Sequence, residues 1–396
     1  MPNTKGHTMT RSANHSSSTG VARPSQRLVS LDILRGITIA FMIMVNNNGD
    51  GHYAWWFMKH AEWNGMTPTD LVFPTFLFVV GASIVFAFEA RLARGASKAQ
   101  LAAQAGKRAI ILFLLGLVVN GFPHFPLATL RIYGVLQRIA ICYLIVSLLY
   151  LWDRRPMSKL ILAGAALVGY WLLMTHVSVP GYGLPGRDIP LLDHDANLVA
   201  WLDRHIFPQR LYEGVRDPEG LLSDLPAVAT TLLGMMTAIW LRTQHSLRVK
   251  AEGLAGGAAL SLALGLLWAV WFPLNKKLWT SSYVLAAAGV SAALWALCYW
   301  AVEIKGWRGR WTWPWLVLGS NAIAAYMISE LLPGAMSLIP VTLDGRRSDP
   351  LRWAFVHWFR LIPNAGLACF AYSAVFLGVC FVPVWMLYRK RIFLKV

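Results

Sequence analysis

Charged residues are scarce in this chain. Asp, Glu, Lys and Arg together make up 14% of its 396 residues, whereas a typical soluble protein has about 25%. Hydrophobic residues account for 56% and include 19 tryptophans. This composition excludes a globular domain with one core. It predicts an all-α, polytopic membrane protein, because long apolar segments satisfy their backbone groups in lipid as helices.

Acidic residues are rarer than basic ones, with 19 Asp and Glu against 36 Lys and Arg, for a net charge of +17. In a soluble protein this imbalance would suggest nucleic acid binding. In a membrane protein, Lys and Arg gather in cytoplasmic loops and meet anionic lipid. We therefore expect membrane lipids, and no nucleic acid, among the partners.

Cysteine is also scarce. The four cysteines all fall inside apolar segments, and none forms a CxxC pair: Cys142, Cys298, Cys369 and Cys380. This placement argues against both a disulfide framework and a zinc site, and no metal is expected.

The apolar segments predict ten membrane spans. They cover roughly residues 29–47, 69–90, 108–122, 131–151, 159–176, 224–241, 253–272, 280–302, 314–332 and 365–388. Residues 1–26 are rich in Ser, Thr and Asn without periodicity, which predicts a disordered cytoplasmic tail. Residues 27–396 are then a single transmembrane domain.

The charge bias predicts the orientation of the spans. With the N-terminus in the cytoplasm, the cytoplasmic segments hold 23 Lys and Arg and the opposite loops hold 12. The positive-inside rule therefore favours cytoplasmic positions for both termini. His60 and the loops 177–223, 272–279 and 333–364 then lie on the far side. The aromatic segment 352–362 is amphipathic, which suggests a helix along the outer interface.

Polar residues crowd the first outer loop. Asn46, Asn47 and Asn48 end the first span, and three asparagines exceed what a helix cap requires. His60 follows, and an imidazole exchanges protons near neutral pH. Asp70 fits the third position of a capping box that begins at "TPTD", and its carboxylate could equally orient an imidazole.

Two arginines flank the motif "IYGVLQ" on one helical face. Arg131 can extend to the outer interface, whereas Arg138 lies two turns deeper. Arg138 therefore needs an anion or a carbonyl partner, from another helix or from a ligand. Gln137 adds a further donor.

Other polar residues precede or occupy later spans. Ordinary explanations for such residues are a solvated loop, a helix cap or interfacial anchoring. The residues are Trp63, Asn64, Asp217, Glu219, Lys276 and Asn321. An imidazole, carboxylates, amides and indoles around one cleft also suit a carbohydrate, although many transporters share this set.

Six blocks of sequence resemble the heparan-α-glucosaminide N-acetyltransferase family, and more closely its shorter bacterial relatives of the NagX type. In order they are "RLVSLDILRGITIAFMIMVN", "KHAEWNGMTPTDLVFPTFLFVVGAS", "LRIYGVLQRIAICY", "DPEGLLSDLPAVATTLLG", "FPLNKKLWTSSYVL" and "LGSNAIAAYMISEL". The resemblance implies a multi-pass acetyltransferase of the bacterial inner membrane. Such an enzyme takes acetyl from cytosolic acetyl-CoA and delivers it to the amino group of a glucosamine-type sugar on the periplasmic side.

The resemblance also implies roles for residues. The family's active-site histidine maps onto His60 and its catalytic asparagine onto Asn46, with Asn47 or Asn48 as replacements. Asp70 would hold the imidazole. Trp63, Asn64, Asp217, Glu219 and Lys276 are expected to bind the acceptor sugar, and Arg131, Gln137, Arg138 and Asn321 to bind acetyl-CoA.

Several alternatives stay open at this point. His60 can act as a general base or carry the acetyl group itself. The chain could instead be an amino-sugar permease, or an acyltransferase that modifies a hydroxyl of an envelope glycan. The acceptor can be a free amino sugar or a glycan, and the oligomeric state, with a homodimer as one option, is equally open.

Overall fold

The computed structural model describes residues 28–394 of the chain, so the tail predicted over residues 1–26 lies outside the described part. The long helices are α1 (Val29–Asn46), α2 (Val72–Leu92), α3 (Lys98–Gly121), α4 (Val135–Trp152), α5 (Pro156–His176), α7 (Asp224–Leu241), α8 (Leu247–Trp268), α9 (Ser281–Tyr299) and α13 (Ala365–Arg389). The shorter elements are α6 (Leu198–Ile206), α10 (Trp313–Ser320), α11 (Ala322–Ser337), α12 (Pro350–Ala354) and an antiparallel hairpin of β1 (Val341–Leu343) and β2 (Arg346–Ser348).

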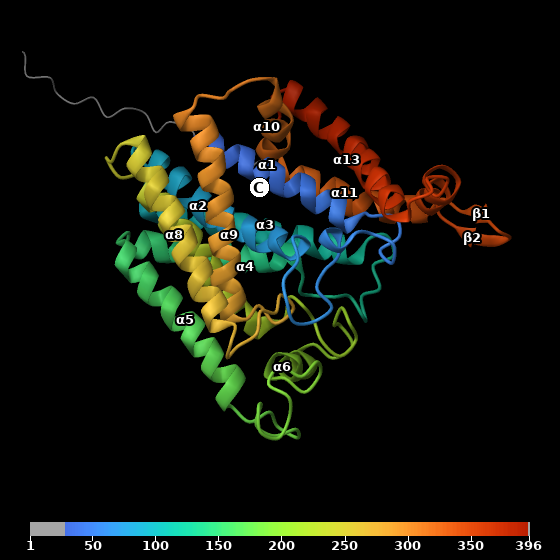
Figure 1. The fold of residues 1–396 in the computed structure, drawn as a ribbon, viewed down its shortest axis with the longest axis horizontal. Coiled ribbons are helices and arrows are strands. Elements are labelled where there is room, and N and C mark those ends of the chain that lie inside the picture. Colours follow the sequence, from blue (N-terminus) through green and yellow to red (C-terminus); the bar gives the residue numbers. More distant parts are fainter. Residues whose placement is uncertain (1–27, 395–396) are drawn as a thin grey trace, which may run out of the picture.

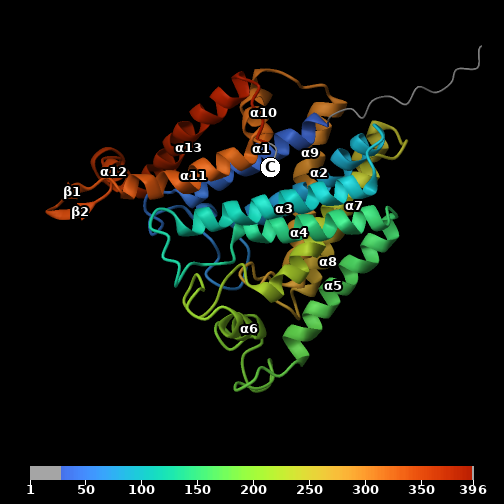
Figure 2. The ribbon, with the colours of Figure 1, turned by 180° about the vertical axis from the view of Figure 1, so that it is seen from behind.

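Within residues 28–394, nine helices are long and apolar enough to cross a membrane, or ten if α10 and α11 form one span. The prediction of an all-α, polytopic membrane protein is therefore confirmed. Figures 1 and 2 show the helices as a bundle, with α3, α4 and α7 lying across its back.

The span predicted over 314–332 is broken into two helices. The chain bends by 74° between α10 and α11, because Asn321 leaves the helical region with φ −128° and ψ 40°. The Asn321 side chain donates to Ile392 O at 3.1 Å and accepts from Leu394 N at 3.0 Å. The bend thus holds the segment that follows α13.

Three other predicted spans begin at other residues, and one of them is 253–272, whose helix α8 begins at Leu247. α3 begins ten residues before the predicted 108, because Ser97 and Gln100 form a complete capping box ahead of the apolar run. α4 begins at Val135 and not at 131, because Gly134 has an extended backbone and residues 131–134 form no helix.

Glycine lets the central helices approach closely. A Cβ on Gly81 of α2 would lie 1.9 Å from Thr231 O, and a Cβ on Gly234 of α7 would lie 1.9 Å from Phe78 O. This reciprocal pair makes α2 and α7 neighbours at backbone distance, as small residues do in membrane bundles. About 67% of each of these spans is buried, against 17% for α8, which lies at the edge.

The loops gather at two ends of the bundle. The loop after α1 binds the long loop after α5 through Trp63 Nε1 and Leu192 O, and it binds the 272–280 loop through Gly65 N and Leu274 O. We call this end the outer end and the opposite one the inner end. The predicted outer-interface segment is helical, formed by α12 and a π-turn over Phe355–Phe359.

Candidate active site

An imidazole and a buried carboxylate meet at the outer end. His60 Nδ1 lies 2.7 Å from Asp70 Oδ1. The His60 side chain is 46% exposed and that of Asp70 is 1% exposed. The pair therefore has one member anchored in the protein and one that an incoming molecule can reach.

Local sequence explains why Asp70 is so firmly held. Its second oxygen, Oδ2, accepts hydrogen bonds from Ala61 N, Thr67 N and Thr67 Oγ1 at 2.9–3.0 Å. The predicted capping box is half formed, since Thr67 Oγ1 donates to Lys59 O and to Asp70 and does not accept from Asp70 N. These bonds leave Asp70 Oδ1 for the imidazole.

This geometry defines the imidazole tautomer. An ionised carboxylate only accepts hydrogen bonds, so His60 Nδ1 carries the proton and donates it to Asp70. The lone pair of Nε2 is then free, and the ring that carries Nε2 is partly exposed. A histidine oriented in this way can take a proton or attack a carbonyl carbon.

The asparagines at the end of α1 have different surroundings. Asn46 Nδ2 donates to Glu330 Oε1 of α11 at 3.1 Å, and Asn46 is exposed. Asn47 forms the helix cap, with its Nδ2 bonded to Ile43 O at 3.1 Å. Capping therefore accounts for Asn47, whereas the Asn46 amide reaches across to another helix.

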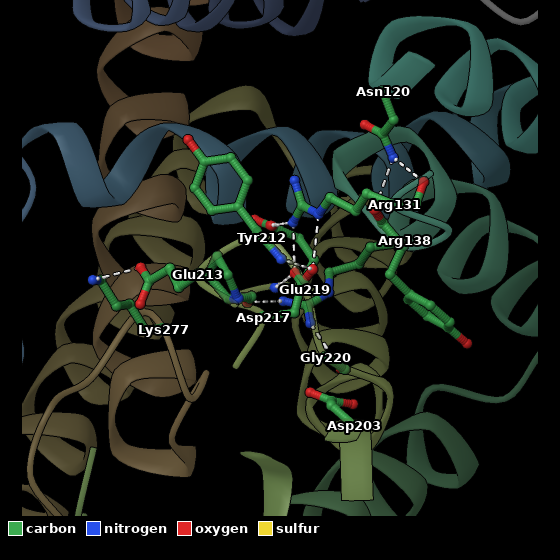
Figure 3. Close-up of polar contacts among 12 residues, drawn as sticks. Asn120, Arg131, Arg138, Asp203, Tyr212, Glu213, Asp217, Glu219, Gly220 and Lys277 are labelled. Atoms are coloured by element: carbon green, nitrogen blue, oxygen red, sulfur yellow. Dashed lines mark hydrogen bonds and ion pairs between the residues drawn. The ribbon is translucent and has the colours of Figure 1, made fainter. Parts of the chain in front are cut away.

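Arg131 lies at the centre of a second cluster (Figure 3). Its guanidinium binds both oxygens of Asp217 at 2.5 and 2.8 Å, and Glu219 Oε2 at 2.5 Å, beneath the ring of Tyr212. Burial acts to lower the Arg131 pKa, but the two carboxylates raise it above its ordinary value. Burial acts to raise the Glu219 pKa, and Arg131 with its neighbouring cations lowers it.

Arg138 is completely buried, and a neighbouring segment supplies its partners. Its Nε lies 2.9 Å from Asp224 Oδ1, and Nη2 donates to both Ser223 Oγ and Gly220 O. The ring of Trp279 lies 4.8 Å from the guanidinium. The anion and carbonyl that Arg138 requires thus come from residues 220–224, so the arginine is satisfied without a ligand.

Sequence analysis assigned Arg131 and Arg138 to one ligand and Asp217 and Glu219 to another. The structure joins all four in one region, and Figure 3 shows Asp217 and Glu219 between the two arginines. Their assignments to acetyl-CoA and to the acceptor remain predictions.

The 272–280 loop is fastened onto the His60 loop. Asn275 Nδ2 donates to Asn64 Oδ1 at 3.2 Å, and Tyr283 Oη donates to Asp70 O at 2.5 Å. Lys276 lies within electrostatic reach of both Glu219 and Asp70. The 272–280 loop is therefore held against the loop that carries His60.

Trp63 is packed within the protein. Its ring stacks on the imidazole of His194 at 4.0 Å, and the charges of Arg216 and Lys277 lie 5.3 and 5.9 Å from it. A small cavity beside it is lined partly by Asp217 and Glu213. A role for this indole toward a sugar stays a prediction.

The two amides predicted to bind acetyl-CoA lie apart. Gln137 is buried against Gly116, and neither its oxygen nor its nitrogen has a hydrogen-bond partner within residues 28–394. Asn321 lies at the inner end, where the segment after α13 takes up its side chain.

Sequence analysis missed Asp203. It lies on α6, within a stretch that we had treated as loop, and is 1% exposed. Burial raises its pKa to about 7, although Leu221 N donates to Oδ1. The amphipathic pattern of "NLVAWLDRHI", with Asn197 as its cap, could have revealed both the helix and its inward-facing acid.

The comparisons with known proteins identify the family of this chain. The model of the family described as "Heparan-alpha-glucosaminide N-acetyltransferase, catalytic" matches residues 27–267, which include every residue of both clusters. This chain belongs to that family.

Two curated members of the family give the extent of the similarity. The mouse heparan-α-glucosaminide N-acetyltransferase is 29% identical over 94% of this chain and 61% of its own length. The human protein of that name is 31% identical over 77% of this chain and 53% of its own length. The chain thus spans about half to three fifths of the length of these relatives.

Proposed function

We propose that this chain is a transmembrane acetyltransferase of the bacterial inner membrane. It moves acetyl from cytosolic acetyl-CoA to the amino group of a glucosamine-type sugar on the periplasmic side. The observation that carries the proposal is the His60–Asp70 pair, because it presents an oriented and accessible imidazole in a family whose members are named for this transfer.

The chemistry of the surrounding residues fits a thioester and an amine. His60 Nε2 removes the proton from the incoming nitrogen, or receives the acetyl group before the nitrogen does. Asp70 keeps the imidazole in the tautomer that both routes require. Asn46 is a neutral donor available to the carbonyl oxygen of the acetyl group, where negative charge develops.

An apolar cavity lies close to the ends of the helices that carry the site. It lies between α1, α2, α4 and α11 and is lined by Met42, Phe73, Phe76, Val135, Leu136, Ile139, Ile323 and Tyr326. Met42 is one turn before Asn46, and Phe73 is one turn after Asp70. The cavity is therefore lined by residues one helical turn away from Asn46 and from Asp70. Its size, about 10 Å³, means that the helices must part for the pantetheine arm to pass.

The test is turnover by the purified protein with acetyl-CoA and glucosamine, measured as free thiol and as N-acetylated product. We expect His60→Ala to lose turnover by at least roughly 10³-fold while it stays folded, since it removes the reacting group. His52→Ala is the matched control, because His52 is an exposed histidine of the same loop that lies against Tyr53. It should keep turnover within about twofold.

Other outcomes would point elsewhere. Near-normal turnover in His60→Ala would remove His60 from the mechanism. An ester product in place of an amide would show transfer to a hydroxyl. Uptake of labelled glucosamine into vesicles that lack acetyl-CoA would show a permease.

A further inference from the structure

α11 carries one charged side chain, Glu330. The bent pair of helices α10 and α11, to which it belongs, has the length and composition of a membrane span. A carboxylate in such a segment is costly, so it is expected to have a partner and a task. Glu330 has its partner on another helix, because Glu330 Oε1 accepts a hydrogen bond from Asn46 Nδ2 at 3.1 Å.

This hydrogen bond joins two helices that lie side by side. α11 packs against α1, as Figures 1 and 2 show. Met42 of α1 and Tyr326 of α11 both line the apolar cavity. Asn46 and Glu330 each follow four residues later, so each lies on the same face of its helix, one turn further along. Both helices run toward the outer end, so the hydrogen bond lies on the outer side of the cavity.

Glu330 determines which way the Asn46 amide faces. An ionised carboxylate only accepts hydrogen bonds, so the nitrogen of the amide, and not its oxygen, is directed toward Glu330. Among residues 28–394, Glu330 is the only side chain that forms a hydrogen bond with this amide, and Asn46 is exposed. Without Glu330, the amide is free to rotate and to exchange the positions of its nitrogen and oxygen.

We propose that Glu330 is a positioning residue, which holds the Asn46 amide so that one N–H stays available to the carbonyl oxygen of the acyl group being transferred. This inference rests on the proposed function. The amide nitrogen has two hydrogens. Glu330 accepts one of them, and the second is left for the oxygen on which negative charge develops. A rotated amide would turn its own oxygen toward that charge and oppose the reaction. Glu330 itself exchanges no proton.

Removal of Glu330 should therefore lower kcat through Asn46. The loss of one donor to such an oxygen typically lowers kcat by roughly 10²–10³-fold, which is the loss expected for Asn46→Ala. Glu330→Ala leaves the donor in place but free to rotate. We therefore expect a smaller loss in kcat, of at least about tenfold, while the KM for acetyl-CoA stays within about threefold. Glu62→Ala is the matched control, because Glu62 is an exposed glutamate of the His60 loop, and it should keep kcat within about twofold.

Glu330→Gln separates a hydrogen-bond acceptor from a base. The glutamine side chain keeps a carbonyl oxygen that accepts from Asn46 Nδ2, so this variant should keep kcat within about threefold of wild type. A glutamate that removed a proton from the acceptor sugar would lose that ability in Glu330→Gln. The kcat of Glu330→Gln would then be as low as that of Glu330→Ala.

A double-mutant cycle tests whether Glu330 acts through Asn46. In an Asn46→Ala background there is no amide to orient, so Glu330→Ala should lower kcat by less than about twofold further. A glutamate that only supports the packing of α11 would lower kcat by the same factor in both backgrounds. The cycle therefore distinguishes positioning of the amide from a structural role.

Each contrary outcome refers to one statement. A loss of less than about tenfold in Glu330→Ala, or equal losses in the two backgrounds, overturns this role of Glu330 and leaves the proposed function standing. If Glu330→Ala does not fold, a loss of more than about threefold in Glu330→Gln overturns it. Wild-type kcat in Asn46→Ala overturns the part of Asn46, and this inference with it, but not that of His60. A wild-type protein that forms no N-acetyl product overturns the proposed function as a whole.

Discussion

Each end of the bundle holds a cluster of three charged side chains, and the two clusters differ in how far their groups are exposed. At the outer end, one arginine, Arg131, pairs with two carboxylates that are 1% and 6% exposed. At the inner end, one carboxylate, Glu89, pairs with two arginines that are 44% and 34% exposed, at 3.4 Å each. The Arg131 cluster is therefore close and has buried carboxylates, whereas the Glu89 cluster is looser and more exposed.

This difference in exposure indicates which ion pairs can hold reactive side chains in place. Exposed pairs contribute about 0–1 kcal/mol, because water screens them. Buried pairs interact strongly, and the loss of one partner leaves a charge stranded in a dry site. The outer end can therefore fix side chains around His60, whereas the inner end tolerates substitution.

The largest expected effect comes from Arg138, the completely buried arginine of the outer end. Arg138→Met leaves Asp224 without its cation and should lower the free energy of unfolding by about 3–5 kcal/mol. Thermal unfolding in detergent measures the change. The double variant Arg138→Met with Asp224→Asn should recover most of it, because no unpaired charge remains. A single variant as stable as wild type would show that the ion pair is not what holds this end.

Sequence patterns predicted much of this end because its residues are conspicuous. A charged residue two turns inside an apolar helix has to find a partner, and the need of Arg138 for an anion followed from that alone. The identity of the partner did not follow, because Asp224 is 86 residues away in sequence and reads locally as a helix cap. The resemblance placed His60 and Asn46 in one family pattern. Asp70 stood out as part of a capping box, and its hydrogen bond to His60 required the fold.

Spans were predictable where hydropathy dominates and less so where backbone geometry does. The bend at Asn321 is invisible to hydropathy, since α10 and α11 are both apolar. α6 was missed because its nine residues are too few for a membrane span, and Asp203 was missed with it.

The second effect is a pH dependence centred on Asp203. Its pKa is raised to about 7 in the folded protein, mainly by burial, whereas in an unfolded chain it is about 3.9. The native state thus holds this proton up to about pH 7, and the unfolded state releases it near pH 4. The free energy of unfolding therefore falls as pH rises through this range.

Between pH 6 and pH 8 this carboxyl should account for about 1.4 kcal/mol of lost stability, since one pKa unit corresponds to 1.36 kcal/mol. Asp203→Asn should lack this component, so the difference in unfolding free energy between variant and wild type should grow with pH. Asp217, Asp224 and Arg138 face the same group and are unchanged in this comparison. Parallel pH curves for the two proteins would contradict the assignment.

The smallest loss of stability is expected at the inner end. It serves as the reference for the loss expected in Arg138→Met. Arg154→Met removes one of the two exposed partners of Glu89, which keeps Arg242 and the Tyr150 hydroxyl at 2.7 Å. We expect a loss of no more than about 1 kcal/mol, reduced further at high salt, because solvent screens this pair. Both arginine variants replace the same residue type by the same residue, so the ratio of their effects isolates burial. If Arg154→Met were as damaging as Arg138→Met, burial would not be the cause, and the outer cluster would lose its special status as the rigid frame of the site.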